Sequence, residues 1–180
     1  MRNVIEEFTR YFCPNISNES LELFQSILSV RSFPKGKIVI KEGQLTNKFY
    51  ILSKGIVRSF IKASDQKERI RTLYIPTNAF GALSSLIIKK ESNASYDCLT
   101  HSEVLEGNFH EFINLTQRNI ELSIFYNKIL ESVFIRTENR ADDLALLNAT
   151  QRYLKLKREI PQIDNLIAQY HIASFLNITP

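Results

Sequence analysis

Long apolar runs are absent from this 180-residue sequence. Its longest runs of apolar residues have four members, as in Phe49–Leu52 and Leu144–Leu147, whereas a transmembrane helix needs about 20. The N-terminal segment Met1–Glu7 carries acidic residues where a secretory signal peptide has its apolar core. We therefore expect a cytoplasmic protein with no membrane partner.

Metal-binding and catalytic patterns are also lacking. Cys13 and Cys98 lie far apart and do not have the spacing of zinc or iron–sulfur ligands. The histidines, His101, His110 and His171, are equally scattered. No phosphate-binding loop or grouping of Ser, His and Asp stands out. We expect two unpaired thiols, no metal, no bound cofactor and no enzymatic activity.

Glycine is confined to the middle of the chain. Its five positions are Gly36, Gly43, Gly55, Gly81 and Gly107. Glycine marks tight turns and destabilises the interior of helices. This distribution predicts a turn-rich β region followed by helices.

Short segments rich in β-branched and aromatic residues fill that middle region. We predict strands at residues 37–41, 48–52, 55–62, 69–75, 95–100 and 102–106. Turn-forming residues separate them at 42–44, 53–55, 63–65 and 76–78. Many short strands with close turns indicate an antiparallel jelly-roll or sandwich.

Helices are expected on both sides of the strands. Leucine and phenylalanine spacing predicts one helix at Asn18–Val30, and Asn114 with Gln117 suggests a capping box. Ile120–Leu147 contains neither glycine nor proline and predicts a helix roughly 42 Å long. Its two apolar stripes suggest two partners, the barrel and a second subunit, although burial within one domain is the alternative. The stripe assigned to the dimer interface is Ile120, Ile124, Leu130 and Phe134.

A basic helix is expected next. Asn148 and Gln151 form a second capping-box pattern, and Pro161 ends the helix that they begin. Its basic residues are Arg152, Lys155, Lys157 and Arg158. They are candidates for phosphate contacts, and a solvated basic face is the alternative.

The segment Gln169–Pro180 resembles the first half of a helix-turn-helix. Asn177 suits a left-handed helix end, Thr179 suits an N-cap, and Pro180 suits a first helical position. The inner face would consist of Ile172, Ala173 and Leu176. A surface helix hairpin is the alternative. The DNA-binding candidates are Gln169, Tyr170, His171, Thr179, Pro180, Arg152 and Lys155.

These features together resemble the Crp/Fnr family of transcription regulators, especially its divergent branch in Bacteroidetes-like bacteria. The motifs stand in the family's order: Lys35-Gly36, Glu42-Gly43-Gln44, Phe49-Tyr50-Ile51-Leu52, Lys54-Gly55 and Phe80-Gly81. The resemblance implies an α+β fold with a cyclic-nucleotide-binding-like jelly-roll, or double-stranded β-helix. It divides the chain into a sensor at 1–118, a dimerisation helix at 119–147 and a partial winged helix-turn-helix at 148–180.

The expected nucleotide site departs from that family's pattern. In the family, a Glu after Phe-Gly holds the ribose, and an Arg about ten residues later pairs with the cyclic phosphate. Ala82 and the segment Ser92–Ala94 occupy these places here, and neither supplies the charge-assisted fork of an arginine. We therefore expect that cyclic AMP does not bind. With Lys89, Lys90 and Glu91 as its charged residues, the site suggests a neutral or weakly polar ligand, or an unused pocket. The candidate ligand residues are Phe80, Gly81, Ala82, Leu83, Ser84, Ser85, Asn93, Ala94 and Ser95.

Two functions follow from this sequence. The first is a homodimeric regulator that senses an unknown small-molecule effector and binds duplex DNA if the chain continues past Pro180. The alternative is a sensor and dimerisation module without DNA binding. The sequence ends where the recognition helix would begin, so we expect the natural protein to continue, with a naturally shortened form as the alternative.

Overall fold

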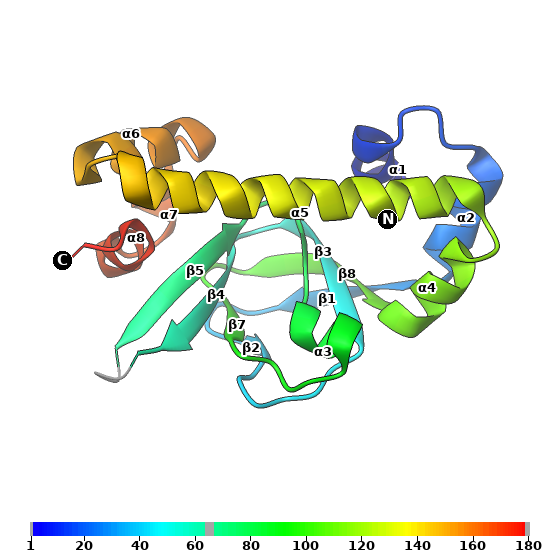
Figure 1. Cartoon of the computed structure of the whole chain (residues 1–180), viewed down its shortest axis with the longest axis horizontal. Coiled ribbons are helices and arrows are strands. Elements are labelled where there is room, and N and C mark those ends of the chain that lie inside the picture. The colour runs from blue at the N-terminus through cyan, green and yellow to red at the C-terminus, as the bar shows by residue number, and fades with distance from the viewer. Residues whose placement is uncertain (1, 64–66, 179–180) are drawn as a thin grey trace.

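Two antiparallel sheets form a barrel, and one long helix lies along it (Figure 1). The structure, a computed structural model, describes residues 2–63 and 67–178. The strand orders are β1-β8-β3-β6 and β2-β7-β4-β5. The strands are β1 (Leu28–Phe33), β2 (Ile38–Ile40), β3 (Lys48–Lys54), β4 (Val57–Lys62), β5 (Glu68–Tyr74), β6 (Ala79–Phe80), β7 (Ser95–Cys98) and β8 (Ser102–Asn108). The predicted α+β jelly-roll is confirmed.

Apolar side chains from both sheets fill the barrel. Leu52, Val57 and Val104 are completely buried there beside stacked aromatic rings. Gly55 is required at one turn because its φ is +96° and an added Cβ would lie 2.4 Å from the carbonyl oxygen of His101. The six predicted strands correspond to β2, β3, β4, β5, β7 and β8, whereas β1 and β6 were not predicted. Much of the predicted turn at 63–65 lies outside the described residues.

Aromatic residues from four helices close one end of the barrel (Figure 1). The helices are α1 (Arg2–Phe12), α2 (Asn18–Ser26), α4 (Phe109–Thr116) and α5 (Ile120–Leu146). The ring of Phe125 contacts those of Phe8, Phe24 and Phe112 at centroid distances of 5.8, 5.2 and 6.3 Å. Each of these four phenylalanines is at most 4% exposed. This cluster fixes the first turns of α5 to the barrel.

Two predicted helix boundaries at this end are wrong. The helix expected at Asn18–Val30 stops at Ser26, because Leu28 already pairs with Gly107 in the β1–β8 ladder. Asn114 and Gln117 do not form a capping box: Asn108 caps α4, and Asn119 caps α5 by accepting a hydrogen bond from the amide of Leu122. The predicted capping pair therefore lies within α4 and at its C-cap, and it does not begin a helix.

The far end of α5 leads into three further helices. They are α6 (Ala149–Glu159), α7 (Ile163–Leu166) and α8 (Gln169–Leu176). The capping box of Asn148 and Gln151 is confirmed, and Asn177 has the predicted left-handed conformation with φ of 54°. Within the described residues, no helix is long and apolar enough to cross a membrane.

Candidate ligand cavity and docked helix

A cavity of about 980 Å³ lies between the barrel, α5 and α8. On the barrel side its wall includes the rings of Tyr74, Phe80 and Tyr96. Phe80 and Tyr96 are nearly parallel, with an interplanar angle of 17° and centroids 6.2 Å apart. The wall therefore offers flat apolar surfaces to a ligand.

The nine candidate ligand residues divide between this cavity and the loop behind it. Those that line the cavity are Phe80, Gly81, Leu83, Ser84 and Asn93. The remaining four do not line the cavity and are buried: Ala82, Ser85, Ala94 and Ser95. Ser85 and Ser95 serve the local backbone, because Ser85 donates to the carbonyl of Lys90 at 2.8 Å and Ser95 accepts from the amide of Glu42 at 3.0 Å.

The loop expected to hold a phosphate is closed on itself. It follows α3 (Leu83–Ile88), which ends at Lys89 in a left-handed conformation. Ser92 donates to the carbonyl of Ala94 at 2.6 Å, and the amide of Ala94 points back to the Ser92 hydroxyl at 3.3 Å. The exposed Lys89 and Lys90 are not among the cavity-lining residues. The described part of this loop therefore directs no cation into the cavity.

Arginines from other elements supply the charge instead. Arg69 and Arg71 on β5 and Arg136 and Arg140 on α5 line the cavity. Arg71 donates to Asn93 at 3.3 Å, and Arg136 donates to Asn78 at 3.4 Å. The expectation of a site with little charge considered the loop alone, and the cavity is lined in addition by these arginines of β5 and α5.

Two of these arginines influence the same tyrosine. Burial raises the pKa of Tyr96, and nearby Tyr74 raises it further, whereas Arg71 and Arg136 act in the opposite direction. The hydroxyl of Tyr96 donates to the carbonyl of Gly81 at 3.0 Å. Arg71 and Arg136 therefore approach the aromatic wall from two different elements.

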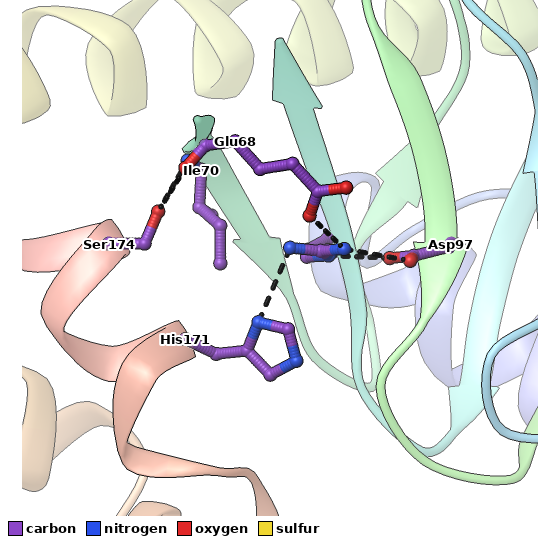
Figure 2. A network of polar contacts seen from close by, with 6 residues as sticks. Glu68, Ile70, Asp97, His171 and Ser174 are labelled. Atoms are coloured by element: carbon purple, nitrogen blue, oxygen red, sulfur yellow. Dashed lines mark hydrogen bonds and ion pairs between the residues drawn. The ribbon is translucent and has the colours of Figure 1, made fainter. Parts of the chain in front are cut away.

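A buried arginine links the barrel to α8. Arg58 on β4 is 6% exposed, and its guanidinium binds both carboxylate oxygens of Asp97, at 2.7 and 3.0 Å. It also contacts Glu68 at 2.7 Å and lies 3.3 Å from Nδ1 of His171 on α8 (Figure 2). Burial lowers the pKa of Arg58, but the hydrogen bonds and charges of Asp97 and Glu68 have the larger combined effect, so the pKa is raised. Burial, and then Arg58, lower the pKa of His171.

Apolar packing and a serine complete this contact. Ser174 on α8 donates to the carbonyl of Glu68 at 3.0 Å and accepts from the amide of Ile70 at 3.1 Å (Figure 2). One apolar cluster joins residues of the barrel to residues of α6–α8: Ile56, Phe60, Ile70, Leu73 and Leu99 with Leu156, Ile163, Ile167, Ile172 and Leu176. We call these contacts between α6–α8 and the sheet the docking interface. They hold the predicted half of a helix-turn-helix against the chain's own barrel.

The sequence of residues 30–119 matches the family described as the cyclic nucleotide-binding domain. The chain belongs to this family. It is similar to the cAMP-activated global transcriptional regulator CRP of Pasteurella multocida (strain Pm70), with 26% identity over 133 residues, 74% of this chain and 64% of the relative. The CRP of Escherichia coli O157:H7 is 25% identical over 136 residues, 76% of this chain and 65% of the relative. The chain thus spans less than two thirds of the length of these curated relatives.

Solved structures share the fold of this cyclic nucleotide-binding family member. FixK2 from Bradyrhizobium japonicum superposes with a TM-score of 0.74 at 14% identity, covering 85% of this chain and 79% of its own. The catabolite activator protein of Thermus thermophilus has a TM-score of 0.62 at 24% identity, covering 93% and 80%. These likenesses extend beyond the barrel into α5 and the helices after it, and they show that the fold is shared.

The structure places the DNA-binding candidates in different surroundings. Gln169 and Tyr170 are exposed, whereas His171 faces the barrel at the docking interface. Arg152 donates to the carbonyls of Leu147 and Leu176, and Lys155 binds Asp143 at 2.6 Å. Thr179 and Pro180 lie outside the described residues. The cationic groups of Arg152 and Lys155 are therefore occupied within the chain in this arrangement.

The expected dimer stripe is largely exposed. Ile120, Ile124 and Phe134 are 74%, 45% and 64% exposed, whereas Leu130 is half-buried and lines the cavity. Ile135 adds a further apolar side chain that is 55% exposed. α5 therefore presents an apolar face away from its own barrel, and Leu130 belongs to the barrel side of the helix.

Proposed function

We propose that the chain is the sensor, dimerisation helix and beginning of the DNA-binding unit of a homodimeric cytoplasmic transcription regulator. The proposed units are residues 1–118, 119–147 and 148–180. The observation that carries the proposal is the shared cavity, which is lined by Tyr74 of the barrel, Arg136 of α5 and Phe175 of α8. A small molecule bound there touches all three units. Such a ligand therefore shifts the equilibrium between two arrangements of these units if it binds one arrangement more tightly than the other.

The docked and released arrangements of α6–α8 are the two states of this proposal. In the docked state, His171 contacts Arg58, and Arg152 and Lys155 are occupied by their own chain. Release would free His171 for DNA beside the exposed Gln169 and Tyr170. The similarity to CRP-type transcription regulators supports duplex DNA as the partner.

We propose an effector other than cyclic AMP or cyclic GMP. The self-closed loop at Ser92–Ala94 and the position of Ala82 support this, because no arginine of that loop is available for a cyclic phosphate. Isothermal titration calorimetry with each nucleotide should give no heat of binding at micromolar concentration. Micromolar affinity for either nucleotide would contradict this part of the proposal.

Selection from a random duplex library tests the DNA-binding function. A chain that continues past Pro180 should select a palindrome whose half-sites are about one helical turn apart. The 180-residue chain should bind the same duplex weakly, without sequence preference, and with a steep loss of affinity as salt rises. Fluorescence anisotropy with the selected duplex and a scrambled control, at several salt concentrations, measures both effects.

The alternative is a sensor and dimerisation module without DNA binding. One observation favours it: His171 and Ser174 of the predicted DNA-binding segment are both engaged by the barrel. If the extended chain selects no sequence, with and without ligands of the cavity, this alternative replaces the regulator proposal.

A further inference from the structure

The joint between α5 and α6 is short and is bridged by side chains. It consists of Leu147 and Asn148, the C-cap of the first helix and the N-cap of the second. The guanidinium of Arg152 on α6 reaches back across the joint and donates to the carbonyl of Leu147. Further along α6, Lys155 binds Asp143 of α5 at 2.6 Å. Both contacts oppose rotation of α6 relative to α5.

The last turn of α8 is bound to both of these helices. Arg152 also donates to the carbonyl of Leu176 at 3.1 Å, and Arg140 of α5 donates to the carbonyl of Phe175. The guanidinium of Arg140 lies 4.1 Å from the ring centroid of Phe175. The last carbonyls of a helix lack partners within the helix and carry the negative end of its dipole, so cationic donors stabilise them. The two arginines therefore fix the end of α8 to α5 and α6.

The second half of α5 is attached less firmly to the barrel. Among the described residues, neither the apolar cluster inside the barrel nor that of the docking interface includes a residue of α5. Arg136 donates to Asn78 at 3.4 Å, which is long for a hydrogen bond. The cavity lies between this half of the helix and the barrel. The second half of α5 is therefore held to α6 and α8 by charged contacts, and it faces the barrel across a cavity.

We propose that Arg140 and Arg152 are positioning residues that lock the joint between α5 and α6, so that α6–α8 and the last turns of α5 move as one body. This inference rests on the proposed docked and released arrangements and names how they interconvert. The body moves relative to the barrel, and the joint keeps its geometry. Arg152 then stays bound within the body in both arrangements and does not contact a DNA phosphate.

Distances between pairs of spin labels on the full chain test the lock. Cys13→Ser removes the more accessible natural thiol, and Cys98 is buried. One pair of labels joins Asp142→Cys of α5 to Gln169→Cys of α8, and the other joins Lys54→Cys of the barrel to the same site on α8. All three labelled positions are exposed. Pulsed electron paramagnetic resonance gives the distance distribution of each pair.

Substitutions at the docking interface should release α8 from the barrel. Ser174→Asp places a carboxylate against the carbonyl of Glu68, and Ser174→Tyr independently places a bulky ring there. Either variant should shift and broaden the distribution between the barrel and α8. The distribution between α5 and α8 should stay narrow and unshifted, because the two arginines still hold that contact.

Removing the two arginines should have the opposite effect. Arg140→Met with Arg152→Met should broaden the distribution between α5 and α8. The matched control, Lys128→Met with Arg158→Met, removes the same charge from exposed positions on the same two helices and should leave both distributions unchanged. Hydrogen exchange around Phe125 should stay unchanged in both double variants, which distinguishes a local positioning role from loss of the global fold.

The outcomes separate this inference from the proposed function. If the Ser174 variants broaden both distributions equally, the joint is free and the inference is overturned, while the docked and released arrangements remain. The inference is also overturned if the arginine pair leaves the distribution between α5 and α8 narrow, or if the control pair broadens it. If neither Ser174 variant changes the distribution between the barrel and α8, the proposed released arrangement fails, and the arginine pair still decides whether the joint is locked.

Discussion

The two halves of α5 have opposite environments. In the first half, Leu122 and Phe125 are completely buried among phenylalanines from α1, α2 and α4. In the second half, Phe134 and Leu146 are 64% and 77% exposed, although they are equally apolar. One end is therefore fixed by its own chain, and the other has a free apolar face next to the docked helices. The docked helices and the cavity-lining residues Arg136 and Arg140 lie at this second half, whereas exposed apolar residues such as Ile120 and Ile124 also occur in the first.

The largest expected effect is at the buried end. Phe125→Ala should lower the free energy of unfolding by about 3–5 kcal/mol, because it leaves a cavity among four aromatic rings. Urea unfolding followed by circular dichroism measures the change. Phe134→Ala is the matched control on the exposed half and should cost well under about 1 kcal/mol in the monomer. Equal losses in the two variants would contradict the contrast between the halves.

Charge on the exposed face should prevent association. Ile124→Glu with Phe134→Glu should weaken the dimer by more than about a hundredfold, because burying unpaired carboxylates in an apolar interface is strongly unfavourable. Sedimentation velocity at micromolar concentration should show a dimer for the wild type and a folded monomer for the variant. As a control, Glu138→Lys and Asp142→Lys alter exposed residues outside the predicted stripe. A monomeric wild type would end the dimer proposal.

A smaller effect is expected at the docking interface. Ser174→Ala removes both hydrogen bonds between the Ser174 side chain and the backbone of β5, and should weaken docking of α8 by about 1–2 kcal/mol. Amide hydrogen exchange should then accelerate in α8 and remain unchanged in the aromatic cluster around Phe125. Exposed Glu103→Gln, on β8, provides the control. Uniform acceleration through the whole chain would mean that the contact stabilises the global fold instead of docking alone.

The smallest effect is a pH dependence of docking. The pKa of His171 is lowered by burial and by Arg58, while Asp97 and Glu68 raise it and Lys35 lowers it. The docked state therefore binds fewer protons than the released state, so docking is favoured above the ordinary histidine pKa of about 6.5 and is lost as pH falls below it. Hydrogen exchange of α8, corrected for intrinsic rates, should be faster at pH 5.5 than at pH 7.5. His171→Asn should reduce this dependence, and an unchanged dependence would exclude His171 as its source.

Local sequence features predicted several elements correctly. Asn148 with Gln151 has the groups to cap a helix, and Asn177 tolerates the left-handed conformation better than most residues. Leu28 shows where local reasoning failed, because it continued a helical pattern but pairs with Gly107, far away in the sequence. The helix α1 was not predicted, and its buried Ile5 and Phe8 pack in the aromatic cluster formed with α2, α4 and α5.

The candidate site shows the same division between features that local sequence predicts and features that depend on distant contacts. The sequence by itself determined the glycine turns, the absence of an arginine near Ser92–Ala94 and the uninterrupted length of α5, because each depends on residue type and local order. Only the tertiary structure brought Arg71 of β5 to the same wall as Arg136 of α5, and Arg58 next to Asp97 and His171. Such contacts join residues separated by dozens of positions. They arise because burial of apolar surface brings the strands and helices together, and no local pattern encodes which charges then meet.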